Sequence, residues 1–227
     1  MKRRYKLALI ILIGIVLTFL INKVNFSSNI NLVAIGDSLS LGMTPYKVAG
    51  TSFNDYLKNE LESKRILNDY NDEFSIDEFK IHTLNECLSK NIKGKYSKIP
   101  IKQIIAKADI LTFALGIDEF SKLNTKEITD EFISNYLKEV EIFFSSVREF
   151  YEKKIILLGL YSANNFSQND AIKVNEKLKI ICGKYDVVFI DILALTLKED
   201  YYLDQNNYYL NYKAHKDITK LIKKVIM

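Results

Sequence analysis

The chain has 227 residues, 48% of them hydrophobic and 26% charged, which is enough for one domain with a substantial core. The formal net charge is +4, and Lys2, Arg3, Arg4 and Lys6 precede the first acidic residue, Asp37. Over the rest of the chain basic and acidic residues balance. This excludes a nucleic-acid reader with a basic stripe, so we expect no nucleic-acid partner.

An uninterrupted apolar run from Leu7 to Ile21 follows the cationic N-terminal tip. Its length lies between that of a signal-peptide core and that of a short membrane span. Because no small-residue cleavage site follows, the pattern favours a transmembrane helix within residues 1–22, a short stalk at 23–30 and a domain at 31–227. Positive charge stays inside, which predicts a single-pass membrane protein with an extracytoplasmic domain; secretion after cleavage is the alternative.

Short apolar runs that are rich in Ile, Val, Leu and Phe recur along the rest of the chain, as is typical of buried parallel strands. They predict strands at 31–36, 76–82, 109–115, 154–160 and 186–192.

Helical patterns separate these runs. One helix begins after Ser52, which forms a capping pattern with Asp55, and others cover about 128–152, 168–182 and 212–226. Ser167 caps the helix at 168–182 and Gly183 is expected to end it. Alternating strands and helices predict an α/β fold, a five-stranded parallel sheet with helices on both faces.

In such a sheet functional residues gather where the strands end, so the loops after Gly36, Leu115 and Ile192 are the candidates. The first loop reads Gly36-Asp37-Ser38-Leu39-Ser40. A serine just past a strand can present its hydroxyl above the sheet, and amides at the N-terminus of a following helix can stabilise an oxyanion. The alternative is that Ser38 or Ser40 only caps a helix.

The stretch AIGDSLSLG, from Ala34 to Gly42, resembles the opening motif of the SGNH, or GDSL, hydrolases. The resemblance implies a three-layer α/β/α, flavodoxin-like fold and a serine hydrolase of ester or acyl groups, with Ser38 as nucleophile and no cofactor or metal. It implies an oxyanion hole formed by Ser38, Gly116 and residue 118. Its substrate would be a small-molecule, lipid or glycan ester.

The second loop departs from the family pattern, because Gly116-Ile117-Asp118 stands where the family has Gly-x-Asn. A carboxylate cannot donate a hydrogen bond to an oxyanion unless burial keeps it protonated. Asp118 as the cap of a helix is the alternative. The family also has a glycine donor after the second strand; here no glycine is present, and His82 or Thr83 would lie near that place.

The C-terminal stretch departs further. Aligning Leu203 to Ile218 with the family pattern on Asn211 places Asn206 at the orienting aspartate and Tyr209 at the histidine that acts as base. His215 then matches a second histidine, which is not the usual base.

A serine hydroxyl needs a base, and neutral tyrosine, whose pKa is near 10, is a poor one. Three readings stay open: His215 acts as base with Asp204 or Asp217 as partner, Tyr209 is activated, or the site binds without turnover. His82 is a further outside candidate. The alternative to the enzyme is therefore a catalytically eroded binding or scaffold module of the cell envelope.

Cys87 and Cys182 lie among apolar neighbours, which predicts buried thiols, with a disulfide as the alternative in an oxidising compartment. With His82 and His215 the only histidines, we expect no zinc site.

Overall fold

The computed structural model describes residues 30–202 and 207–226, which form a five-stranded parallel sheet in the order β2-β1-β3-β4-β5. Each strand apart from β1 and β2 is four or five residues long, as buried parallel strands often are. The strands are β1 (Ile30–Gly36), β2 (Leu67–Ser75), β3 (Ile110–Ala114), β4 (Lys154–Leu158) and β5 (Val187–Ile190).

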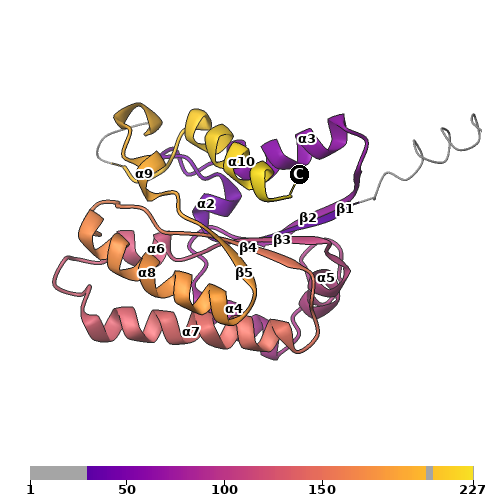
Figure 1. Ribbon diagram of the computed structural model, residues 1–227, viewed down its shortest axis with the longest axis horizontal. Coiled ribbons are helices and arrows are strands. Elements are labelled where there is room, and N and C mark those ends of the chain that lie inside the picture. Colours follow the sequence, from indigo (N-terminus) through magenta and orange to yellow (C-terminus); the bar gives the residue numbers. More distant parts are fainter. Residues whose placement is uncertain (1–29, 203–206, 227) are drawn as a thin grey trace, which may run out of the picture.

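Helices cover both faces of the sheet. Figure 1 shows α3 and α10 on one face, with α4, α7 and α8 on the other. The helices are α2 (Ser38–Leu41), α3 (Phe53–Ser63), α4 (Ile81–Ser89), α5 (Ile101–Lys107), α6 (Ile117–Ser121), α7 (Asp130–Arg148), α8 (Gln168–Lys184), α9 (Leu193–Thr196) and α10 (Tyr212–Ile226), with a 3-10 turn, η1, at Glu199–Tyr201. The three-layer α/β/α architecture that the sequence predicts is confirmed.

The predicted strand at 76–82 is wrong. The second strand is β2, at Leu67–Ser75, while residues 76–80 form a loop and Ile81 begins α4. β2 is an edge strand that pairs only with β1, so much of it stays exposed and it carries polar residues. The apolar pattern that marks the buried strands is therefore missing from it.

The N-terminal caps predicted for two helices are confirmed. Ser52 and Asp55 form a reciprocal capping box at the start of α3, and Ser167 caps α8. The end predicted at Gly183 is off by a short distance, because α8 continues to Lys184 and Tyr185 is its C-cap.

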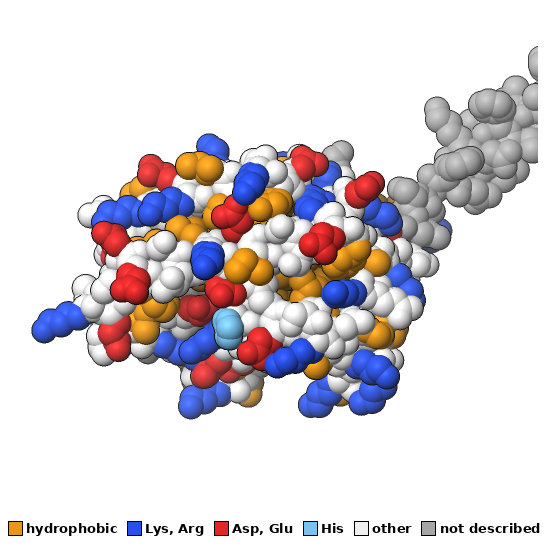
Figure 2. All heavy atoms as spheres, turned by 90° about the horizontal axis from the view of Figure 1, so that it is seen from below, with side chains coloured by type: hydrophobic (Ala, Val, Ile, Leu, Met, Phe, Trp, Pro, Cys, Tyr) orange, Lys and Arg blue, Asp and Glu red, His pale blue; other side chains and the backbone are white. Residues whose placement is uncertain are grey.

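Figure 2 shows acidic and basic side chains interspersed over the face that includes α7. Many of these charges pair across the surface, for example Lys184 with Glu141 at 2.5 Å, and each such pair stabilises the fold by about 1 kcal/mol at most. This mixed surface agrees with the balance of charges in the sequence.

Among the described residues, no helix is long and apolar enough to span a bilayer. The predicted anchor, 1–22, and the predicted stalk up to residue 29 lie outside the part of the chain that the structure describes. Ile30 begins β1. Both cysteines are free thiols; Cys182 is buried as predicted, and Cys87 is half-buried. Burial raises the pKa of the Cys182 thiol to about 12.

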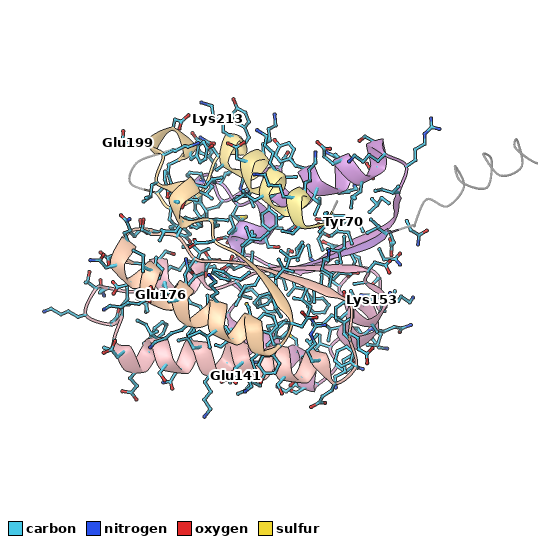
Figure 3. All side chains as sticks on the ribbon, viewed as in Figure 1. Tyr70, Glu141, Lys153, Glu176, Glu199 and Lys213 are labelled. Carbon is cyan, nitrogen blue, oxygen red and sulfur yellow. The ribbon has the colours of Figure 1, made fainter. Side chains whose placement is uncertain are left out.

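Side chains fill the space between the sheet and both helical layers (Figure 3). On the α7 side the core contains an aromatic cluster in which Phe113 of β3 stacks on Phe143 at 4.8 Å and meets Phe144 edge-on at 5.5 Å. All three rings are fully buried. The cluster joins the central strand to the longest helix.

We expect Phe113→Ala to lower the free energy of unfolding by about 3–5 kcal/mol, because it removes a buried ring and leaves a cavity between two others. Urea unfolding followed by circular dichroism measures the change. Ile180→Ala is the control: its side chain is exposed, so its effect should stay within about 0.5 kcal/mol. Equal effects of the two substitutions would contradict this account of the core.

Candidate active site

The end of β1 lies beside the end of β3, at the point where the strand order of the sheet reverses. Gly36 permits this approach, because a Cβ at that position would lie 1.9 Å from the carbonyl oxygen of Ala114. Gly116 follows β3 with a φ of 126°, and a Cβ there would collide with the hydroxyl of Tyr136. These two glycines bring the loop after β1 against the loop after β3.

Asp37 holds the two loops together. Its Oδ1 accepts the backbone N–H of Leu39 at 3.1 Å, which makes Asp37 the N-cap of α2. Its Oδ2 accepts the N–H groups of Gly116 at 2.7 Å and Asp118 at 3.3 Å. Burial, and next the charge of Asp118, raise the pKa of Asp37 well above its usual value. Because Asp37 is the cap, the hydroxyl of Ser38 is left for another partner.

That partner is Asp118, in the first turn of α6. The hydroxyl of Ser38 donates to Oδ1 of Asp118 at 2.7 Å. The predicted nucleophile and the residue at the family's asparagine position are therefore in direct contact. The N-cap of α6 is Gly116, so the Asp118 side chain reaches across to α2 and does not cap its own helix.

Two backbone amides converge on the other oxygen of this carboxylate. Oδ2 of Asp118 accepts the N–H of Ser38 at 3.0 Å and the N–H of Glu78 at 3.0 Å. Paired amides of this kind are the donors that stabilise an oxyanion in acyl transfer. The amide of Gly116, which the family resemblance assigns to the oxyanion hole, is bound to Asp37.

Glu78 lies in the loop after β2 and has a φ of 59°, in the left-handed region that residues with a side chain seldom adopt. The family resemblance implies a glycine donor after the second strand, and in the structure Glu78, not His82 or Thr83, supplies an amide from that loop. Its side chain turns outward to Lys122, at 2.6 Å. The loop thus supplies the second amide without a glycine, at a cost of about 1–2 kcal/mol in backbone conformation.

Tyr208 supplies the fourth donor to Asp118. Its hydroxyl donates to Oδ1 at 2.8 Å, and Tyr161 braces the loop by donating to the carbonyl oxygen of Tyr208 at 2.8 Å. The ring of Tyr209, the residue at the family's histidine position, lies against the Tyr208 ring at a tilt of 34°, with 3.2 Å between the two hydroxyls. Burial raises the pKa of Tyr209, so this phenol is not activated as a base.

His215 lies in the core and not at Ser38. Its Nδ1 accepts the backbone N–H of Phe53 at 3.1 Å, and its ring stacks on the Phe53 ring. Burial lowers its pKa to about 4. Its suggested partner Asp217 instead contacts Tyr201 and pairs with Lys220 at 2.6 Å. The other suggested partner, Asp204, and Asn206 lie outside the described residues.

His82 is exposed on α4, between Glu86 at 3.3 Å and Glu139 at 3.6 Å. Neither histidine therefore hydrogen-bonds Ser38. Within residues 30–202 and 207–226, no group of three or more His, Cys, Asp or Glu side chains is arranged to hold a metal ion.

Ser38 and Asp118 are each 2% exposed, so the hydroxyl is covered in this conformation. Tyr208 also forms part of the wall of a hollow of about 420 Å³. Other residues of this wall follow β4 and β5, including Ser162, Asn164 and Glu199. Ser38 and Asp118 are not part of this wall.

Sequence reasoning missed Glu78 and Tyr208. Nothing in the residue type marks Glu78, because its contribution is a backbone amide. The misplaced strand at 76–82 also removed its loop from consideration. Tyr208 adjoins Tyr209 in the sequence, and the alignment on Asn211 singled out only the second tyrosine.

No protein-family model matches the chain, and no curated protein sequence matches it. Solved structures do match over most of its length. A mutant of Axe2, an acetyl-xylooligosaccharide esterase from a Geobacillus species, aligns with a TM-score of 0.66 and 15% identity, covering 87% of this chain and 94% of that one. This chain therefore shares its fold with this esterase.

Two further structures agree. A lipase/acylhydrolase from Enterococcus faecalis gives a TM-score of 0.63 and 16% identity, over 86% of this chain and 94% of that one. A lipase from a goat rumen metagenome gives 0.67 and 16%, over 87% and 98%. The fold that the Gly36–Ser40 motif implied is therefore confirmed. Sequence identities of 15–16% show a shared fold alone.

The buried His215 should make stability depend on pH. The folded chain holds it neutral with a pKa of about 4, while in the unfolded chain it takes up a proton near pH 6.5. Its contribution is therefore complete above about pH 6.5 and is lost as pH falls toward 4, by about 3 kcal/mol in all.

We expect the stability of His215→Asn not to show this decrease at low pH. The side-chain oxygen of the asparagine can still accept a hydrogen bond from the Phe53 amide. The measurement is the free energy of unfolding in urea between pH 4 and pH 8 for both proteins. The difference in the free energy of unfolding between the parent protein and His215→Asn should be largest above pH 6.5 and should decrease below it. Parallel curves would contradict the placement of His215.

Proposed function

We propose that this protein is a serine ester hydrolase of the SGNH type, with Ser38 as nucleophile. The observation that carries the proposal is the position of the Ser38 hydroxyl. It lies at the switch point of the sheet, 2.7 Å from a carboxylate oxygen of Asp118 and beside the two amides of Ser38 and Glu78. The esterases and lipases of the same fold support the proposal.

In the proposed reaction Ser38 Oγ attacks the carbonyl carbon of an ester and displaces the alcohol. The resulting acyl-enzyme is then hydrolysed by water, which releases the acid and restores Ser38. Because Ser38 is 2% exposed in this conformation, the substrate carbonyl reaches it only after the residues that cover it move.

For the substrate we propose ester or acetyl groups of lipids or of cell-envelope glycans. One structural neighbour is an esterase of acetylated xylo-oligosaccharides and another is a lipase, so the fold accommodates both classes. The apolar run at Leu7–Ile21 behind a cationic tip supports a single membrane anchor with the domain outside the cell, and secretion is the alternative.

A second candidate function is a binding or scaffold module that retains the fold without turnover. The specific observation in its favour is that the carboxylate of Asp118 occupies both candidate oxyanion donors, while no histidine contacts Ser38. In this reading Asp118 is a structural anchor for the loops around it.

Labelling with a fluorophosphonate separates the two functions. We expect the purified full-length chain in detergent micelles to form a stoichiometric adduct at Ser38, located by mass spectrometry, and Ser38→Ala to form none. Ser40→Ala is the matched control, since Ser40 lies on the same helix but bonds to Ser75 and Asn54, away from Asp118. A folded protein that stays unlabelled over hours would favour the binding module.

A further inference from the structure

We propose that Asp118 is the proton acceptor of Ser38 and takes the part that a histidine has in related enzymes. This inference rests on the proposed function and names the base for that reaction. Oδ1 of Asp118 accepts a hydrogen bond from the Ser38 hydroxyl at 2.7 Å, which is within reach for transfer of the proton. The bond is buried, since both residues are 2% exposed.

The other candidate bases are occupied elsewhere. His215 is fixed in the core by the Phe53 amide, and His82 lies on the exposed face of α4 between two glutamates. The hydroxyl of Tyr209 contacts Tyr208, and burial raises its pKa. Asp118 is thus the group that the structure places at the serine proton.

The carboxyl group of Asp118 is buried, accepts four hydrogen bonds and lies beside the carboxyl group of Asp37. Titratable and charged groups face Asp118 from α2, α6 and the loops after β2, after β4 and before α10. They are Asp37, Asp77, Glu78, Glu119, Lys122, Tyr161, Tyr208 and Tyr209.

In the first step the Ser38 Oγ–carbon bond forms, the carbonyl π pair moves onto the carbonyl oxygen, and the serine proton passes to Oδ1 of Asp118. The negative charge thereby leaves the carboxylate and appears on the substrate. The amides of Ser38 and Glu78, which hold Oδ2 in the free protein, then have the new oxyanion as their stronger acceptor.

In the second step the carbon–oxygen bond to the alcohol breaks, and the alcohol leaves with the proton from Asp118. Water then attacks the acyl group and gives a proton to Asp118, and that proton returns to Ser38 Oγ as the acid departs. The sum is ester plus water giving acid plus alcohol. Tyr208 is a positioning residue, because it acts on the reaction only by holding Oδ1.

The test is the rate constant for fluorophosphonate labelling of Ser38 in the full-length chain, measured from pH 5.5 to pH 8. A base with the ordinary pKa of an imidazole would lose about tenfold in labelling rate at pH 5.5, and we expect the rate to change by less than about threefold. Asp118→Asn should lower the rate at pH 8 by at least about 100-fold. The control Asp77→Asn removes a nearby carboxyl that does not contact Ser38, and should label at the rate of the parent protein.

Two further variants keep the test decisive. If Asp118→Asn fails to fold, Asp118→Ala with added sodium formate should label at least about tenfold faster than with equal sodium chloride, and the pH profile of the parent protein stands independently. Tyr208→Phe removes the hydroxyl that holds Oδ1, so the folded variant should label more slowly than the parent protein at pH 8.

Labelling of Asp118→Asn at the parental rate or faster would overturn this inference and leave the hydrolase proposal intact. The same holds for a tenfold fall in the parental rate toward pH 5.5, or for a folded Asp118→Ala that formate does not rescue. No labelling of the parent protein would instead remove the proposed function itself.

Discussion

The hydrogen bonds of the Asp118 carboxylate join four segments that lie far apart in the sequence. They connect α6 to α2 through Ser38, to the loop after β2 through Glu78, and to the loop before α10 through Tyr208. A buried carboxyl group is stable only where its oxygens are hydrogen-bonded, so these segments must keep their positions together. The geometry around Ser38 therefore follows from how one buried carboxyl group is hydrogen-bonded by the protein.

A second carboxyl lies next to the first. Asp37 is also fully buried, and it accepts the amides at the start of α2 and at the end of β3. Burial, and next the charge of the neighbouring Asp118, raise the pKa of Asp37. The pair draws the two loops at the switch point toward each other, because each carboxyl binds amides of the other's loop.

Local patterns predicted the buried strands and the amphipathic α10, because burial of one face leaves a periodic trace in the sequence. The edge strand β2 leaves no such trace, and its misplacement hid Glu78. The Gly36–Ser40 motif located Ser38, but it did not predict the hydrogen bonds of Asp118. Whether Tyr208 or Tyr209 reaches Asp118 depends on the backbone path before α10. His215 matched a motif, yet its position on the inner side of α10 turns it to Phe53.

The donors next to Ser38 belong to the main chain, and this has a consequence for how the site can change over generations. Substitution cannot delete the N–H of Ser38 or Glu78 unless proline is introduced. The acceptor that faces these two N–H groups is the side chain at position 118, and substitution can change it. Reactivity on this scaffold is therefore adjusted by the side chain at position 118, where the exchange of an oxygen for a nitrogen alters charge while shape is nearly kept.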